Sequence, residues 1–340
     1  MKFSTFHLFH RFPGQSVKEV YDHHAELIEL AEELGFHGAR VAEHHFRDYG
    51  TVPSGLAFLA HMAGRTERLR LGTGIVVLPL YNPVHVAEQA AMVDVLSGGR
   101  LDLGVGRGYQ SYEFDGCGVD LSRSRGRFDE ALETVLALWG GEPVRREGAF
   151  SSVAPELDEG VCLMPGPLQS PRPPVHVAAV SPETVERYAA RGLPILADPA
   201  APFSRVARAA EAWRSTAAAH GHDPDAAELV VGRSVYVAPS AGQAREDLER
   251  FEASFDRTRI FNERSAPLDR RTGEMAQGFE YWQNRYMKGA EVGTDDRWER
   301  LEVVGDPERV VGQVRMLQEM GFGHLLCDFG STRRMPLEEM

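Results

Sequence analysis

The stretch GRLDLGVGRGYQ, residues 99–110, decides which fold this chain is expected to adopt. Leu101, Leu103 and Val105 alternate with polar or small residues, which predicts a β-strand. The strand runs into Arg107, which lies between two glycines, and no helix is expected at that point. Because glycine lets a backbone approach a ligand closely, the loop after this strand is predicted to bind an anion.

A second basic run, RSRGR at residues 123–127, precedes a helical pattern that begins at Phe128. Its Arg125 and the earlier Arg107 carry guanidinium groups, which suit the oxygen atoms of a phosphate. We therefore predict that the two arginines bind one phosphate together. The alternative that each is a solvated surface arginine stays open.

A dinucleotide-binding, doubly wound sheet is the main competing fold, and it fails on the spacing of the glycines. In GVGRG at residues 104–108, the position of the third fingerprint glycine is taken by Tyr109. A helix would also have to begin there, and the pattern predicts none. The strand and its loop therefore favour a different α/β fold.

Strand and helix patterns alternate along the whole chain. Strands are expected at residues 2–9, 38–42, 69–78, 100–106, 175–180, 195–197, 229–238 and 324–329. Helices are expected at residues 17–34, 54–64, 84–96, 128–139, from 182 onward, 203–219, 241–255 and 307–320. This order predicts a (β/α)8 TIM barrel.

The barrel is predicted to form a single domain over residues 1–340, with two interruptions. One is an insertion near residues 141–172. The other, near residues 262–300, is polar and weakly periodic, and a stretch of that length indicates either disorder or a functional lid. We predict a mobile lid.

Composition limits the partners and the location of the protein. The 37 Lys and Arg residues against 50 Asp and Glu residues give a net charge of −13, which argues against nucleic-acid or anionic-membrane partners. Three widely spaced cysteines indicate neither a disulfide framework nor a structural zinc site. The first twelve residues resemble a strand and not a signal peptide, and no apolar run is long enough to cross a bilayer. The cytoplasm is the expected location.

Glu43, His44 and His45 follow a short strand, and in a barrel the carboxyl ends of the strands carry the chemistry. Two adjacent histidines at a strand end point to opposite sides, and no His-Glu-x-x-His motif accompanies them. Metal binding is therefore a minor hypothesis, and no metal ligand is assigned. One imidazole can face the barrel mouth as a general base or hydrogen-bond donor. A purely structural histidine pair is the alternative.

Ser181, Pro182 and Thr184 open a helix after the strand at residues 175–180. The free amide groups and the positive dipole end of such a helix favour an anion, so Ser181 is predicted to join Arg107 and Arg125 around one phosphate. Plain helix capping explains Ser181 equally well.

Motifs along nearly the whole chain resemble the bacterial luciferase-like flavin monooxygenases, and most closely the catalytic α subunit of luciferase. The motifs are EHHF at 43–46, LGTGIVVLP at 71–79, NPV at 82–84, GGR at 98–100, GRG at 106–108, SR at 124–125, RGLP at 191–194, KG at 288–289 and VGDPE at 304–308. The resemblance implies a barrel that binds reduced FMN non-covalently and reacts it with O2 to a flavin 4a-hydroperoxide. One oxygen atom then passes to an organic substrate.

The resemblance also implies roles for single residues. His44 matches the catalytic histidine, and the phosphate cradle matches Arg107, Arg125, Ser181 and Thr184. The remaining matches to the flavin site are Glu43, Tyr109 and the pair Gly74-Ile75, which corresponds to a cis peptide bond against the flavin ring. The substrate is expected to be small and apolar or aromatic, since the residues predicted around the barrel mouth are Phe6, Leu8, His45, Phe46 and Tyr109.

Three departures from luciferase predict an enzyme without light emission. Val180 stands where a glutamate precedes the phosphate-binding serine, which puts the flavin affinity in question. Gly106 replaces a cysteine, and Ser254 falls where luciferase has a tryptophan.

The resemblance further implies partners. A separate flavin reductase should supply the reduced FMN, because no dinucleotide fingerprint is visible in this chain. The helices near residues 54–64 and 84–96, with Glu88, match the dimer-forming region of the family and predict a homodimer. The alternatives are a deazaflavin-dependent hydride-transfer enzyme on the same barrel, a non-catalytic flavin-binding partner subunit, and a metal-dependent hydrolase.

Overall fold

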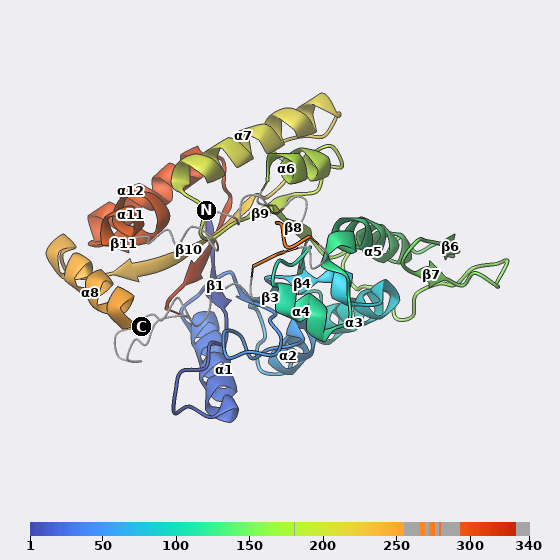
Figure 1. The fold of residues 1–340 in the computed structure, drawn as a ribbon, viewed down its shortest axis with the longest axis horizontal. Coiled ribbons are helices and arrows are strands. Elements are labelled where there is room, and N and C mark those ends of the chain that lie inside the picture. Colours follow the sequence, from blue (N-terminus) through green and yellow to red (C-terminus); the bar gives the residue numbers. More distant parts are fainter. Residues whose placement is uncertain (180, 255–265, 269–271, 276–278, 280–292, 331–340) are drawn as a thin grey trace.

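Parallel strands close into a barrel in the computed structural model, which describes residues 1–179, 181–254, 266–268, 272–275, 279 and 293–330 (Figure 1). The eight barrel strands run in the order β1-β2-β3-β5-β8-β9-β10-β12, and β12 pairs with β1 to close the ring. These strands are β1 (Lys2–His7), β2 (Gly38–Val41), β3 (Arg70–Thr73), β5 (Leu101–Gly106), β8 (Val175–Ala179), β9 (Ile195–Ala197), β10 (Val230–Val237) and β12 (His324–Asp328). The predicted TIM barrel is confirmed.

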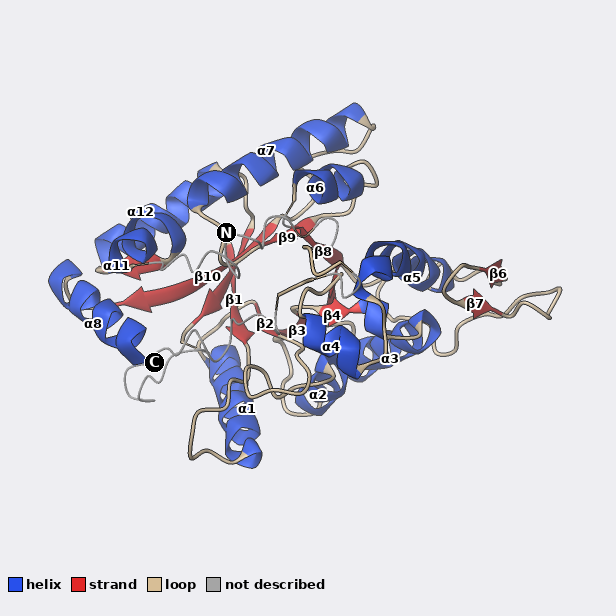
Figure 2. Cartoon of the chain, viewed as in Figure 1, coloured by secondary structure: helices blue, strands red, loops and turns tan. Residues whose placement is uncertain are grey.

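Helices surround the barrel on its outer side, as Figure 2 shows. They are α1 (Val17–Glu33), α2 (Gly55–Ala63), α3 (Pro83–Leu96), α4 (Ser111–Gly116), α5 (Ser124–Leu138), α6 (Pro182–Ala189), α7 (Phe203–Ala219), α8 (Ala241–Ser254), α11 (Thr294–Asp296) and α12 (Pro307–Glu319). Short 3-10 turns span Leu78–Leu80 and Leu121–Arg123, and a π-helical turn spans Arg297–Leu301.

Smaller strands complete the sheet and mark the first interruption. β4 (Val76–Val77) pairs with β5, and β11 (Val303–Gly305) pairs with the carboxyl end of β10. The segment between α5 and β8, where the insertion was predicted, contains a hairpin of β6 (Arg146–Glu147) and β7 (Ser152–Val153). Figure 1 shows this hairpin beyond α5, away from the barrel.

Helix ends follow the capping signals of the sequence. Ser16 caps α1 in a capping box, because its hydroxyl accepts from the Glu19 N–H at 3.2 Å and the Glu19 carboxylate accepts from the Ser16 N–H at 2.7 Å. Asp306 caps α12 by its side chain alone, accepting from the Arg309 N–H at 3.0 Å. Gly321 then has a φ of 96° and ends that helix, as the sequence predicted.

Three expected boundaries around the deciding stretch are wrong. The strand expected at residues 69–78 is split into β3 and β4 at Gly74-Ile75, whose peptide bond is cis. A helix, α4, does begin at Ser111, four residues after Arg107. Helix α5 begins at Ser124 and not at Phe128, because Leu121, Ser124 and Phe128 are buried at helical spacing although the intervening residues are polar.

The barrel interior is filled by a buried arginine. Arg40 on β2 reaches across the barrel to β8, where its Nη2 lies 3.1 Å from Nδ1 of His176. Glycines make this possible: a Cβ atom at Gly72 would lie 2.9 Å from Arg40 Cγ, and one at Gly104 would clash with the Thr73 carbonyl oxygen. On the outer face the strands pack apolar side chains, Leu71, Leu101, Leu103 and Val105 among them, in the buried core.

Candidate active site

Two segments at the carboxyl ends of barrel strands form the candidate active site. Glu43, His44 and His45 follow β2, and the loop 107–110 follows β5. Only β3 separates the two strands in the sheet, so both segments lie on one rim of the barrel. In barrels of this kind that rim carries the active site.

His44 is paired with a buried carboxylate. Its Nδ1 atom lies 2.8 Å from Oε1 of Glu113, and the same oxygen accepts a hydrogen bond from the His45 backbone N–H at 3.1 Å. The Glu113 side chain is 1 % exposed and that of His44 is 11 % exposed. The sequence reasoning did not select Glu113, because it lies on α4, a helix that the pattern did not predict.

His45 is paired with the other carboxylate of the motif. Its Nε2 lies 3.2 Å from Oε1 of Glu43, which also accepts from the Val77 N–H at 3.3 Å. Burial raises the pKa of Glu43 although these hydrogen bonds oppose the shift. Burial alone would lower the pKa of His45, but the hydrogen bond and charge of Glu43, with the charge of Glu113, outweigh it and raise that pKa. Glu43 thus links His45 to the segment after the cis peptide bond.

Apolar side chains lie at the same end of the barrel interior. A Cβ atom at Gly74 would lie 2.9 Å from the Phe6 ring, and one at Gly106 would clash with Ile75 Cδ1. Phe6 and Ile75 pack with Leu196, Val230 and Leu326, which come from three other barrel strands. The structure thus brings Phe6 and Ile75 together.

The other side chains predicted around the mouth lie in different settings. Leu8 is 5 % exposed and belongs to the buried core. Phe46 has a φ of 62° and is 66 % exposed, and its ring lies against Gly116 of α4. Tyr109 packs in an apolar cluster with Ile75, and its ring centroid is 6.3 Å from that of His44. The roles of Leu8 and Phe46 toward a substrate stay predictions.

The predicted phosphate ligands divide between two places on the rim. Ser181 caps α6: its Oγ accepts from the Thr184 N–H at 3.3 Å and lies 3.0 Å from Thr184 Oγ1. Hydrogen bonds from its own N–H and from Ser181, with the charges of Arg125 and Arg205, lower the pKa of Glu183. Arg125 and Arg205 of α7 are thus the cations that act on Glu183 at the start of α6. The sequence reasoning did not select Arg205, and a phosphate shared by Arg107, Arg125 and Ser181 stays a prediction.

Arg107 has a different neighbour. Its guanidinium carbon lies 3.6 Å from the ring centroid of Phe279, a cation–π contact. Gly108, the next residue, has a φ of 74°, and a Cβ atom there would lie 2.5 Å from Val77 Cγ1. The close packing explains why a glycine follows Arg107.

The donors at the start of α6 fit the phosphate end of FMN. The hydroxyls of Ser181 and Thr184, the positive dipole end of the helix and two guanidinium groups suit an anion, although the Glu183 and Thr184 N–H groups are already bonded to the Glu183 carboxylate and to Ser181 Oγ. These donors lie on the same rim as His44, so a molecule bound there by its phosphate would extend its other end toward the barrel mouth.

The family model described as luciferase-like monooxygenase matches residues 1–324. The chain belongs to that family. Its resemblance to the family, expected from the sequence motifs, is thereby confirmed, and the chain is an enzyme of the flavin-dependent monooxygenase class.

Single relatives agree with the family assignment. The chain is 27 % identical over 326 residues to the oxygenase component of the flavin-dependent trigonelline monooxygenase of Acinetobacter baylyi, covering 95 % of this chain and 87 % of that protein. It is 39 % identical over 188 residues to an uncharacterized protein of Sinorhizobium fredii, and the match spans about half of each protein, 55 % of this chain and 52 % of the relative.

A solved structure also matches along the full length. The crystal structure of a monooxygenase from Streptomyces bottropensis is 29 % identical, with a TM-score of 0.80, and the match covers 100 % of this chain and 95 % of that one. The barrel found here is therefore the barrel of the luciferase-like family.

Several predictions lie partly or wholly outside the described residues. Most of the lid near residues 262–300 lies outside them, as do Val180 and the side chain of Ser254. The described part of that segment contacts the rim: Ala266 and Phe279 are buried in one cluster with Phe114, and the Ala266 carbonyl accepts a hydrogen bond from Ser111. Movement of this segment stays a prediction.

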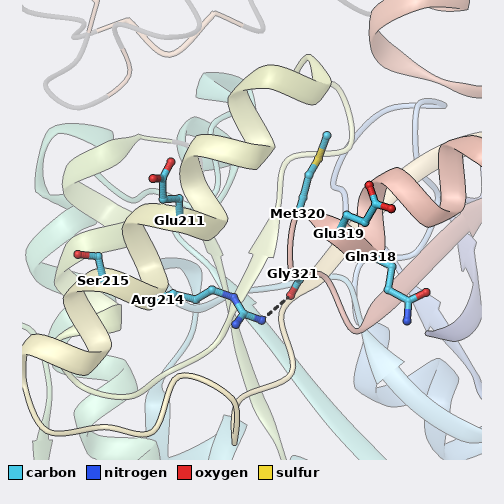
Figure 3. A pocket seen from close by; sticks show the side chains of 7 residues that line it. All are labelled: Glu211, Arg214, Ser215, Gln318, Glu319, Met320 and Gly321. Atoms are coloured by element: carbon cyan, nitrogen blue, oxygen red, sulfur yellow. Dashed lines mark hydrogen bonds between the residues drawn. The ribbon is translucent and has the colours of Figure 1, made fainter.

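Figure 3 shows a surface hollow of about 580 Å³ from close by. It lies between α7 and the end of α12, and α12 precedes β12, so the hollow is at the amino end of that strand. Its Arg214 donates to the Gly321 carbonyl at 3.1 Å and forms an ion pair with Asp225. These contacts give this luciferase-like chain a structural link between α7 and α12 and no evident chemistry.

Neither metal nor membrane features emerge from the described residues. Within them, no group of three or more His, Cys, Asp or Glu side chains is arranged to hold a metal ion. None of the helices in that part of the chain is long and apolar enough to cross a membrane.

Proposed function

We propose that this chain is the oxygenase component of a two-component, FMNH2-dependent monooxygenase that transfers one oxygen atom to a small apolar or aromatic organic substrate. The observation that carries the proposal is the arrangement on one rim: the pair of His44 and Glu113 lies at the barrel mouth, and hydroxyl groups that suit an anion lie at the start of α6. The family supplies flavin use. The substrate and the two-component organisation are our inference.

Each group on the rim has a proposed task. Arg125, Ser181 and Thr184 bind the phosphate of FMN, with Arg107 on the neighbouring loop. Bound reduced FMN supplies the two electrons with which O2 is split between the substrate and a molecule of water. Phe6 and Ile75 line the mouth with apolar surface and exclude water from it. His44 accepts or returns a proton at its Nε2 atom.

A separate reductase fits this scheme. The sequence lacks a dinucleotide fingerprint, and the trigonelline relative is itself named as the oxygenase component of its enzyme. We propose that a reductase delivers FMNH2 to this chain. The cytoplasm, where such reductants are available, stays the predicted location.

Helix α3 supports the predicted homodimer. Its inner side is apolar, with Ala87, Ala90 and Val93 buried, and its outer side carries Met92 and Leu96, which are 45 % and 57 % exposed, beside an exposed ion pair of His85 and Glu88. An outer face with neighbouring exposed apolar side chains is typical of a protein–protein contact. We propose that a second copy covers it, and light scattering should give twice the mass of the chain. A monomer at micromolar concentration would contradict the proposal.

The main test follows reduced flavin in the absence of a reductase. The protein is mixed anaerobically with FMNH2, and 18O2 is then admitted together with a straight-chain aldehyde, a cyclic ketone or a phenol as the probe. We expect FMNH2 to bind before O2 is added, to reoxidise more slowly than free FMNH2, and one probe to gain a single 18O atom. Reoxidation at the rate of free FMNH2, with no label in any probe, would overturn the proposal.

The three alternative functions predict different results in this experiment and in simple controls. A deazaflavin-dependent hydride-transfer enzyme would bind the deazaflavin in preference to FMN and would consume no O2. A non-catalytic flavin-binding subunit would bind FMNH2, and its behaviour would not change in the variant His44→Ala. A metal-dependent hydrolase would be purified with stoichiometric metal.

A further inference from the structure

We propose that Glu113 is the positioning residue for His44: its carboxylate holds the imidazole with the proton on Nδ1 and leaves Nε2 as the free base at the barrel mouth. The inference rests on the proposed function only in taking His44 as the group that handles a proton there. The tautomer itself is a property of this chain and can be measured without any flavin.

The hydrogen bonds of one oxygen atom carry the argument. Oε1 of Glu113 lies 3.1 Å from the backbone nitrogen of His45 and 2.8 Å from Nδ1 of His44. A backbone N–H can only donate, so Oε1 is an acceptor in the first contact. A carboxylate carries no hydrogen atom, so Oε1 accepts in the second contact as well, and the hydrogen atom of that bond is on Nδ1. A neutral imidazole carries only one N–H, and its Nε2 therefore keeps a lone pair.

The surroundings of the ring hold it in this orientation. The ring of Tyr49 lies 4.7 Å away between centroids, and that of Tyr109 lies 6.3 Å away at a right angle. Gly50 leaves room on the Cδ2 edge, where a Cβ atom would lie 3.0 Å from the ring. Within the described part of the chain no group forms a hydrogen bond with Nε2, so this atom remains available to a molecule beside the loop after β5.

The neighbouring acid–histidine pair uses the other ring nitrogen. His45 contacts its carboxylate, Glu43, through Nε2 and not through Nδ1. If both carboxylates accept, His44 has its proton on Nδ1 and His45 has a proton on Nε2. Two consecutive histidines therefore have different ring nitrogens bonded to carboxylates. This difference makes His45 an internal control for His44.

The arrangement defines how a proton would move. Nε2 of His44 takes a proton from a donor in the mouth and forms an imidazolium, while Nδ1 keeps its own hydrogen and its bond to Glu113. The carboxylate stabilises the positive charge and receives no proton, as the aspartate does in a Ser-His-Asp triad. The same proton leaves again from Nε2, so the count of protons on the pair is restored.

Nitrogen NMR of protein with 15N-labelled histidine tests the proposal directly at pH 8 in the absence of flavin. In the wild-type chain the His44 signals should show the Nδ1–H tautomer. In Glu113→Ala the proton should move largely to Nε2, the intrinsically favoured site. Glu113→Gln keeps the shape of the side chain and should give a mixture. A wild-type His44 with its proton on Nε2, or an unchanged tautomer in Glu113→Ala, would overturn the proposal.

Glu43→Gln is the matched control, because it changes the other acid–histidine pair on the same motif. It should alter the His45 signals and leave those of His44 at the Nδ1–H tautomer. If Glu113→Ala does not fold, as judged by circular dichroism, Glu113→Gln alone decides the question. A pure Nδ1–H tautomer in Glu113→Gln would then count against the charge of the carboxylate as the cause.

Activity gives a second and separable readout. With FMNH2 and O2, Glu113→Gln should lower turnover about 10²-fold, the lower end of what general acid–base catalysis contributes, while the dissociation constant of FMN stays within about twofold. If the wild-type chain consumes no O2, the proposed function fails and the tautomer result still stands. If the chain turns over with His44 protonated on Nε2, only the role of Glu113 fails.

Discussion

The two ends of the barrel interior both bury charged and polar groups, but they pair them differently. At the amino end the partners of buried Asp102 are permanent cations: Arg70 lies 2.6 Å away and Arg40 lies 4.0 Å away. At the carboxyl end two buried carboxylates, Glu43 and Glu113, are held by histidines. An arginine or lysine keeps its charge at neutral pH, whereas a histidine can gain or lose a proton. The amino end therefore favours stability, and the carboxyl end favours proton transfer.

Removing the imidazole at the carboxyl end should have the largest effect. We expect His44→Ala to lower oxygen transfer about 10²- to 10⁴-fold, the usual contribution of a general acid or base, with FMN binding retained. Oxygen-18 incorporation and a fluorescence titration with FMN measure the two quantities. His176→Gln at the middle of the barrel is the control: it should reduce stability and leave turnover per folded molecule intact. Equal loss of turnover in both variants would break the distinction between the ends.

Neutralising a carboxylate at the amino end should act on stability. The hydrogen bond from Arg70 and the charges of Arg40 and Arg70 lower the pKa of Asp102, although burial opposes this shift. Asp102→Asn leaves buried Arg40 and partly buried Arg70 without this negative charge, and we expect a loss of about 3 to 5 kcal/mol in the free energy of unfolding. Urea titration at pH 7 measures it. Asp22→Asn, which breaks an exposed pair with Lys18, should change that free energy little; a comparable loss there would show that burial is not the cause.

The sequence predicted the barrel and the rim because both depend on local patterns. Alternating apolar residues, capping residues such as Ser16 and Asp306, and glycines at helix ends are each read from neighbouring positions. The carboxyl ends of parallel strands meet on one rim, so residues as far apart as His44 and Ser181 could be assigned to one site before any contact was known.

Contacts that depend on long-range packing were not predictable in the same way. Glu113 meets His44 only because a six-residue helix, too short to show a period, returns the chain over the rim. Arg40 looked like one residue of a buried strand, and its place inside the barrel depends on missing side chains at Gly72 and Gly104 on other strands. Such space is a property of the closed barrel, and no single segment encodes it.

A side chain added at Gly104 should lower the free energy of unfolding less than breaking the ion pair of Asp102 does. A Cβ atom at Gly104 would clash with the Thr73 carbonyl oxygen and lie 3.2 Å from Arg40 Nη1. We expect Gly104→Ala to lower the free energy of unfolding by about 1 to 3 kcal/mol, as overpacking usually does. The matched control is Gly312→Ala on α12, where no atom lies within 4 Å of the added Cβ.

The control should change stability in the opposite direction. Alanine stabilises a helix relative to glycine, so Gly312→Ala should raise the free energy of unfolding by about 0.5 to 1 kcal/mol. Urea titration of the two variants beside the wild type is sufficient. A stabilising Gly104→Ala would mean that the barrel can widen around Arg40, and the amino end would then be less rigid than its paired charges suggest.

A third set of buried histidines, between β1 and α1, has neither an arginine nor a carboxylate in its hydrogen bonds. His7 Nδ1 lies 3.1 Å from His24 Nδ1, and His7 Nε2 lies 2.8 Å from Thr5 Oγ1. Burial, with the charge of His23, lowers the pKa of His7 to about 3, and burial also lowers that of His24. Both rings are thus neutral in the folded protein, whereas they titrate near 6.5 in the unfolded chain.

The free energy of unfolding should therefore fall in mild acid, and this is the smallest of the predicted effects. Between pH 6.5 and about 3 the unfolded chain binds more protons than the folded one, so the free energy of unfolding drops as pH is lowered, by up to about 1.4 kcal/mol per pH unit for each such histidine. Above pH 6.5 the full stability is present.

His7→Asn should make the slope between pH 6 and pH 5 shallower, and the same change at exposed His61 should leave it unaltered. Because His176 is also held neutral, by burial and by Arg40, a residual slope is expected. An identical slope in wild type and His7→Asn would show that the pair beside β1 takes up protons without unfolding, and acid sensitivity would then have to originate at the carboxylate–histidine pairs of the rim.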